Sequence, residues 1–107
     1  MQEYFEIGQI VNTFGIKGFV KVNPFVDDIL RFDDLEKVYL RRNKEIKELQ
    51  VEEVKYHKNR VLVKFKGIDK VEDAELLRNF YLLYYLHRIY KMHHMVHLLL
   101  FFVLKTN

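Results

Sequence analysis

The sequence predicts a small all-β protein, a β-barrel with one short helix late in the chain. Its 107 residues, half of them apolar, are enough for one domain with a modest core. Short runs rich in Val, Ile and Phe recur along the chain and lack helical spacing, which favours strands. Because several short strands at regular spacing are typical of small barrels, we expect that architecture here.

The first two elements are a predicted strand pair, residues 5–14 and 19–25, joined by the sequence GIKG. Glycine at both ends of this turn allows a positive φ without a Cβ clash, so Gly15 and Gly18 are the predicted backbone turn residues. Pro24 has no N–H to donate, which places it at a strand end or edge.

The middle of the chain predicts a single turn and three further strands. Asp27 and Asp28 precede a short apolar stretch, as a capped turn would require, and the strand at 37–40 follows. Runs 48–57 and 60–67 are separated only by Lys-Asn, which predicts a hairpin. Its second strand would place three apolar residues on one face: Val61, Val63 and Phe65.

The segment 69–79 predicts the short amphipathic helix. Asp69 stands where an N-cap would be, with Glu72 three residues later. Val71, Ala74 and Leu77 would then share the face that packs on the barrel.

Composition excludes several kinds of function. The chain has no Cys and no Ser, so it can form neither a disulfide nor a Ser or Cys nucleophile, and it suits the cytoplasm. The N-terminus lacks the pattern of a secretory signal. Residues 1–80 hold 15 Lys and Arg against 15 Asp and Glu with the signs interleaved, which favours a solvated surface over a phosphate-tracking stripe.

Two sets of residues could hold a metal or perform acid-base chemistry, and a structural interpretation is favoured for both. The pairs at 27–28 and 33–34 are adjacent aspartates, but each lies where a turn or cap wants an acid. His93, His94 and His97 could share a helix face, yet no acid lies nearby. We therefore predict no catalytic residue, no metal and no cofactor.

The C-terminal segment differs from the rest of the chain. We expect the barrel to comprise residues 1–83, and residues 84–107 to be an atypical apolar, histidine-rich tail that is not a domain, because the tail has no Gly, Pro or acid. Its apolar run, 95–104, is too short to span a membrane, which needs about 20 residues. We predict no membrane partner, although an interfacial anchor remains an alternative to a poorly ordered segment.

Three segments carry a resemblance to a known family: IGQIVNTFGIKGFVKVNPFVDD, RFDDLEKVYL and VKFKGIDKVEDAELLRNFYL. Their order and spacing, from residue 5 to residue 82, are similar to the N-terminal domain of the RimM family of ribosome maturation factors, also called 16S rRNA processing proteins. The resemblance implies a six-stranded antiparallel β-barrel of the translation-protein type. Because the family continues into a second, PRC-type barrel, we interpret this chain as a truncated or frameshifted relative.

The resemblance also implies a function. Members are assembly factors without enzymatic chemistry that bind the head of the free small (30S) ribosomal subunit, in company with small-subunit ribosomal protein nineteen, and assist 16S rRNA processing. We expect a cytoplasmic monomer, with rRNA as a further contact. The residues predicted to bind the partner lie in the matching segments, and are Phe14, Ile16, Lys17, Arg31 and Phe32.

One alternative function stays open, a generic small β-barrel that binds RNA. It would use the cations of residues 17, 21, 41 and 42 with the rings of Phe14 and Phe19 as a platform for charge and stacking. The four cations are Lys17, Lys21, Arg41 and Arg42. A phosphate-driven binder loses affinity steeply with salt, and a protein-docking module does not.

Overall fold

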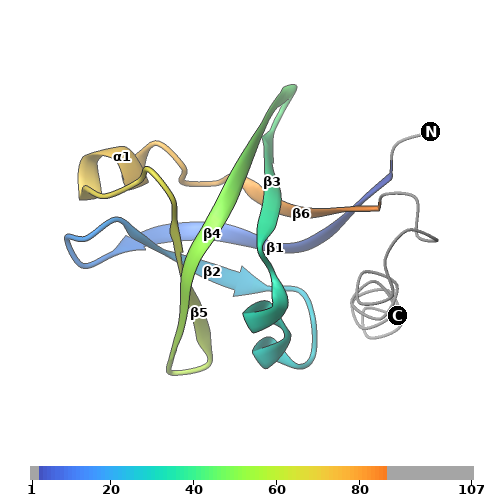
Figure 1. The fold of residues 1–107 in the computed structure, drawn as a ribbon, viewed down its shortest axis with the longest axis horizontal. Coiled ribbons are helices and arrows are strands. Elements are labelled where there is room, and N and C mark those ends of the chain that lie inside the picture. The colour runs from blue at the N-terminus through green and yellow to red at the C-terminus, as the bar shows by residue number, and fades with distance from the viewer. Residues whose placement is uncertain (1–2, 87–107) are drawn as a thin grey trace.

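The computed structural model describes the backbone of residues 3–86 and the side chains of residues 4–84. This part of the chain folds into six strands, one 3-10 helix and one α-helix (Figure 1). The strands are β1 (Glu3–Phe14), β2 (Phe19–Pro24), β3 (Lys37–Arg42), β4 (Glu45–His57), β5 (Arg60–Phe65) and β6 (Tyr81–Leu86). The helices are the 3-10 helix η1 (Ile29–Asp34) and α1 (Val71–Glu75).

The strands close into a barrel in the order β1-β2-β5-β4-β3-β6, and each strand is antiparallel to both of its neighbours. The all-β prediction with six strands and one short helix is therefore confirmed. Register shifts interrupt β1 at two points, between Glu6 and Gly8 and between Ile10 and Asn12, and such bulges add the twist that a small barrel needs. No helix in residues 3–86 is long and apolar enough to cross a membrane.

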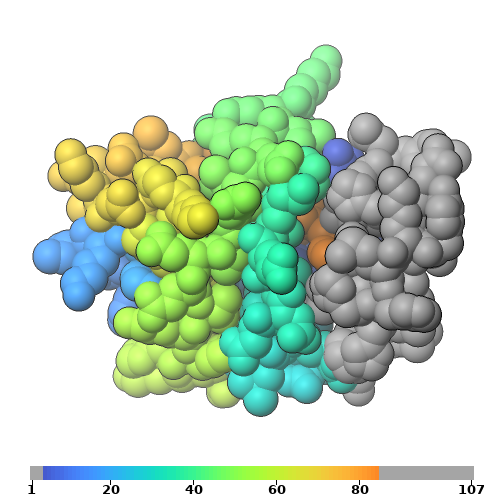
Figure 2. Space-filling view, in the orientation of Figure 1, coloured from blue at the N-terminus to red at the C-terminus, as the bar shows by residue number. Residues whose placement is uncertain are grey.

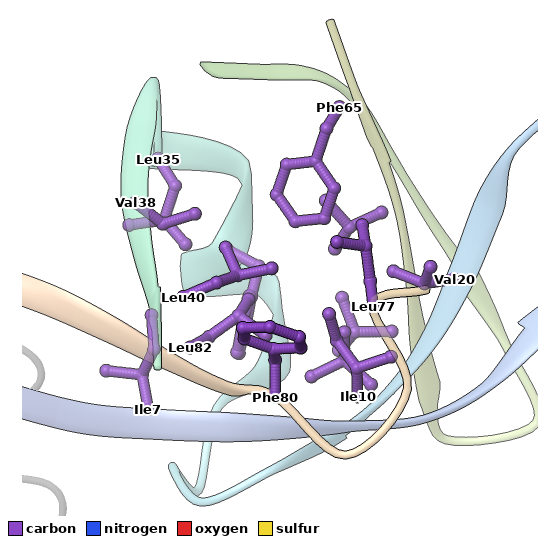
Figure 3. Packing of buried hydrophobic residues seen from close by; sticks show 14 of the residues in the cluster. Ile7, Ile10, Val20, Leu35, Val38, Leu40, Phe65, Leu77, Phe80 and Leu82 are labelled. Atoms are coloured by element: carbon purple, nitrogen blue, oxygen red, sulfur yellow. The ribbon is translucent and has the colours of Figure 1, made fainter. Parts of the chain in front are cut away.

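The interior is filled by one cluster of buried apolar residues from five of the strands and both helices, and partly buried residues of β4 pack against it. The strands alternate inward and outward residues, so Val20 and Val22 of β2 face Val61 and Val63 of β5 inside the barrel. Figure 3 shows Phe65, Phe80 and Leu77 converging on the same interior. The predicted inward face of residues 61, 63 and 65 is confirmed, since all three side chains are buried.

The turn between β1 and β2 depends on its two glycines. Gly15 has φ +70° and Gly18 has φ +98°, as their positions in the sequence predict. Gly18 has a second constraint, because a Cβ there would lie 2.1 Å from the carbonyl oxygen of Ile68. The turn is thus seated against the backbone that leads from β5 to α1.

The start of α1 differs from the prediction. Its N-cap is Lys70, with no side-chain capping bond, so the role predicted for Asp69 is wrong. The Asp69 carboxylate instead accepts a hydrogen bond from Lys64 Nζ at 2.7 Å, and Glu52 accepts another at 3.2 Å. Lys64 is only 7% exposed, and an ammonium taken out of water needs such partners. The two hydrogen bonds raise the pKa of Lys64, that to Asp69 most, against the lowering effect of burial.

The remaining elements agree with the sequence in kind and differ in extent. The predicted single turn is η1, whose Asp28 side chain accepts from the Leu30 N–H at 3.1 Å. Pro24 ends β2, as expected. The β3–β4 hairpin begins its second strand at Glu45, earlier than the predicted 48. β6 continues to Leu86, past the boundary expected at 83, and residues 87–107 of the predicted tail lie outside the described residues.

The two constraints on Gly18 can be separated with a second glycine. Gly67 also has a positive φ, +86°, but a Cβ there meets nothing within 4 Å. We expect Gly67→Ala to lower the free energy of unfolding by about 1 kcal/mol through backbone strain alone. Gly18→Ala adds a clash with backbone, so it should cost at least about 2 kcal/mol more in urea unfolding. Equal losses would mean that the Ile68 backbone moves aside freely.

The ion pair of Lys64 can be tested through its carboxylate. Asp69→Ala leaves a buried ammonium short of an acceptor, so we expect it to cost about 1–2 kcal/mol in thermal or urea unfolding. Glu72→Ala is the control, because it removes an equal charge from an exposed position of α1. It should lower the free energy of unfolding by less than about 0.5 kcal/mol.

The same pair predicts a pH dependence. The folded pKa of Lys64 is raised above its ordinary 10.5, so the stabilisation is complete below that pH. It is lost as pH rises through the raised value, and the difference between parent and Asp69→Ala should shrink there. A difference that stays constant across alkaline pH would contradict an ionic contribution.

Ring closure predicts where the chain can be shortened. A fragment of residues 1–86 contains every strand of the barrel and should give a dispersed amide NMR spectrum and a cooperative melt. A fragment of residues 1–80 lacks β6, which leaves the edges of β1 and β3 unpaired, and it should not fold cooperatively. A collapsed spectrum for the longer fragment would refute the prediction.

Candidate docking surface

The β1–β2 hairpin places two of the predicted contact residues at an exposed tip (Figure 1). Ile16 is 79% exposed, the largest exposed fraction among the large apolar residues of the described part of the chain, and Lys17 beside it is also exposed. The turn is held by the flanking strands and by Gly18 against Ile68, so the tip is presented on a rigid support. An apolar and a cationic side chain side by side could contact either protein or nucleic acid.

Phe14, at the base of this tip, lies in a small group of aromatic and basic side chains. Its ring centroid is 5.4 Å from that of His57, with the planes tilted by 48°. Lys21 Nζ lies 5.7 Å from the Phe14 centroid, and Lys55 Nζ lies 4.8 Å from the centroid of Phe19. These distances are typical of cation–π contacts.

The second part of the predicted site lies elsewhere. Arg31 and Phe32 belong to η1, which Figure 1 shows well away from the β1–β2 tip, below β3. Phe32 is wholly buried in the core, so its side chain is not available to a partner. Phe32 is therefore corrected from a contact residue to a core residue. Arg31 is half-buried, and the structure brings together only Phe14, Ile16 and Lys17 of the five.

The aspartates around η1 have structural roles. Asp28 caps the helix, and Asp33 Oδ1 accepts a hydrogen bond from the Tyr56 hydroxyl at 2.7 Å. The pKa of Tyr56 is raised, mainly by burial and secondly by the hydrogen bond to Asp33. Among the residues whose side chains are described, no three His, Asp or Glu lie close enough to hold a metal ion. The histidines at 93, 94 and 97 lie outside the described residues.

The platform of the alternative RNA-binding hypothesis is only partly assembled. Lys21 of β2 lies over the Phe14 ring at the end of β1, but the Phe19 ring is contacted by Lys55, and Arg41 and Arg42 lie at the end of β3. Arg41 pairs with Glu6, and the Arg42 guanidinium stacks 4.3 Å from the Phe80 ring. Lys55 and His57 were not predicted from the sequence, because their contacts with Phe19 and Phe14 arise from long-range strand pairing. Their one signal was the predicted 48–57/60–67 hairpin, which sets them on one strand face.

Comparison with known proteins gives a consistent match. The family described as the RimM N-terminal domain matches residues 5–87. A ribosome maturation factor RimM of Clostridioides difficile is 51% identical over 76 residues, which are 71% of this chain and 44% of that protein. The corresponding protein of Ruminiclostridium cellulolyticum is 39% identical over 82 residues, 77% of this chain and 48% of that protein. The chain thus spans about half the length of these curated relatives.

Two solved structures share the fold. One, described as a putative 16S ribosomal RNA processing protein RimM from Pseudomonas aeruginosa, has a TM-score of 0.73 and 28% identity, covering 84% of this chain and 53% of that one. The N-terminal domain of RimM from Thermus thermophilus has a TM-score of 0.64 at 18% identity, covering 77% and 88%, and supports the fold alone. From the family match over residues 5–87 and these relatives, the chain belongs to the RimM family.

Proposed function

We propose that this chain is a ribosome assembly factor that binds the head of the free small subunit and assists 16S rRNA processing and maturation. Small-subunit ribosomal protein nineteen is its proposed protein partner at that position. The chain acts in the cytoplasm, as a monomer, through binding and without a cofactor.

The observation that carries this proposal is the family match, which runs from residue 5, within β1, to residue 87, just past the end of β6. Relatives that are 39–51% identical over this region carry the name ribosome maturation factor. A match of this extent covers the core and also the β1–β2 hairpin, where the exposed tip lies. The barrel of this chain is therefore suited to supply one part of the docking surface.

The size of the chain sets the expected strength of binding. Association costs translational and rotational freedom whatever the size of the interface, and only the surplus appears as affinity. The 107 residues match about half the length of these relatives, and a polypeptide of that extent offers less surface to bury against the subunit. We expect the 107-residue chain to bind small subunits more weakly than a full-length relative.

The exposed tip provides the direct test. Ile16→Asp replaces the exposed apolar side chain of the β1–β2 turn with a charge, and should weaken binding of the chain to purified free small subunits about tenfold or more. Ile46→Asp is a matched control, because Ile46 is also exposed, at 48%, at the end of the β3–β4 hairpin. It should leave affinity unchanged. Both affinities are measured by fluorescence anisotropy with labelled chain.

Two outcomes would count against the role of the tip, and a third against the expected weak binding. Unchanged binding by Ile16→Asp, with parent binding intact, would remove the tip from the interface. Equal weakening by the two variants would show a general effect of added negative charge. Binding by the 107-residue chain as tight as by a full-length relative would contradict the expected loss of affinity.

A further inference from the structure

The outward face of β2, β5 and β4 carries a row of side chains that the proposed docking tip does not use. Lys21 on β2 pairs with Leu62 on β5, and Leu62 pairs in turn with Lys55 on β4. The next pair along, His57 with Arg60, extends the row toward the β4–β5 turn. We define the outer patch as Lys21, Lys55, His57, Arg60 and Phe14.

The outer patch has an apolar base beneath its charges. Leu62 lies between the inward-facing Val61 and Val63 and so points outward, yet it is only 3% exposed. The register places a lysine on each side of it, and lysine stems cover apolar surface while their ammonium groups stay in water. The contacts of Lys55 with Phe19 and of Lys21 with Phe14 hold both ammonium groups above this base.

The patch concentrates positive charge in a body that is neutral overall. Residues 14–21 and 54–62 contain five Lys or Arg and no acid, whereas residues 1–80 as a whole are balanced at 15 of each sign. Acids border the patch: Glu53 lies 3.8 Å from Lys55, and Glu52 and Asp69 bind Lys64, two residues along β5 from Leu62. The segment 27–36, around η1, has the opposite character, with five acids and one Arg. Figure 2 shows the blue β1–β2 hairpin bordering the green β4–β5 surface.

The chemistry of the patch fits a phosphate backbone. Cations that follow neighbouring strands track a charged chain, and an accessible aromatic edge adds contact with a base. Phe14 is half-buried, and its ring is shared by Lys21 and His57. We propose that the outer patch binds phosphates of ribosomal RNA in the small subunit. This inference rests on the proposed function, and it names the part of the barrel that touches RNA.

The test removes three charges from the patch and three from elsewhere in the full chain. The patch variant is Lys21→Gln, Lys55→Gln and Arg60→Gln. The control variant is Lys37→Gln, Lys44→Gln and Lys47→Gln on the β3–β4 hairpin, where Lys37 lies 3.2 Å from Glu48 and Lys47 lies 3.4 Å from Glu45. Glutamine keeps much of each stem, and thermal melts establish that both variants are folded.

Binding to free small subunits and to a naked 16S rRNA transcript is measured from low to moderate KCl. The slope of the logarithm of affinity plotted against the logarithm of salt concentration should become shallower by roughly 2 when three phosphate contacts are lost. Binding should weaken about 50-fold near 0.15 M salt. The control variant, with the same net charge, should keep the parent's slope within about 0.5.

The outcomes separate the two proposals. If the parent binds subunits and the patch variant matches its affinity and slope, the RNA contact is overturned while the proposed function stands. A loss on subunits with an unchanged slope, and none on naked rRNA, would assign the patch to a protein partner and overturn the inference. If the parent does not bind subunits, the proposed function fails. The RNA contact of the outer patch is then judged from binding to the naked transcript alone. Weaker binding of the transcript by the patch variant than by the parent supports the RNA contact. Equal affinity of the two proteins for the transcript, or no binding by the parent, overturns it.

Discussion

Closure of the barrel is the constraint on which the rest of the structure depends. β6 is hydrogen-bonded to β1 on one side and to β3 on the other, so it joins the two ends of what would otherwise be an open sheet. The connection into it is fixed by a reciprocal pair of backbone bonds, from the Ile10 N–H to the Phe80 carbonyl and from the Asn79 N–H to the Ile10 carbonyl. With both edges paired, the inner face can be wholly apolar, and Phe80 is buried there.

Features of the fold that depend only on neighbouring residues could be predicted from the sequence. The φ values of Gly15 and Gly18 follow from the short turn, and the cap of η1 follows from an acid before a short apolar stretch. β6 could not be located in the same way, because Tyr81–Leu86 is apolar throughout and lacks alternation. Its identity as a strand comes from its two neighbours in the ring, which are distant in sequence. Asp69 shows the same limit. Its position in the sequence suits a helix cap, but in the structure its carboxylate binds the buried ammonium of Lys64.

The predicted contact residues divide along the same line. Phe14, Ile16 and Lys17 share a hairpin and lie together, because they are at most three residues apart around one turn. Arg31 and Phe32 were grouped with them from sequence motifs alone, and nothing local in the sequence distinguishes an exposed Phe from one that η1 turns inward. The outer patch could not be predicted from the sequence for a related reason. Its residues come from four strands, β1, β2, β4 and β5, and only the register brings them together.

A barrel of this size leaves function to a few positions. The inward residues are committed to packing, so any surface that binds must be built from outward residues and turns. On this chain the cations of the outer patch lie on β2, β4 and β5, and the acidic segment 27–36 lies around η1. An uneven distribution of charge can orient a protein in the field of a polyanion before contact is made. The exposed tip, which carries Ile16, would then meet its site from a restricted set of directions, so charge would govern the approach and apolar contact the residence time.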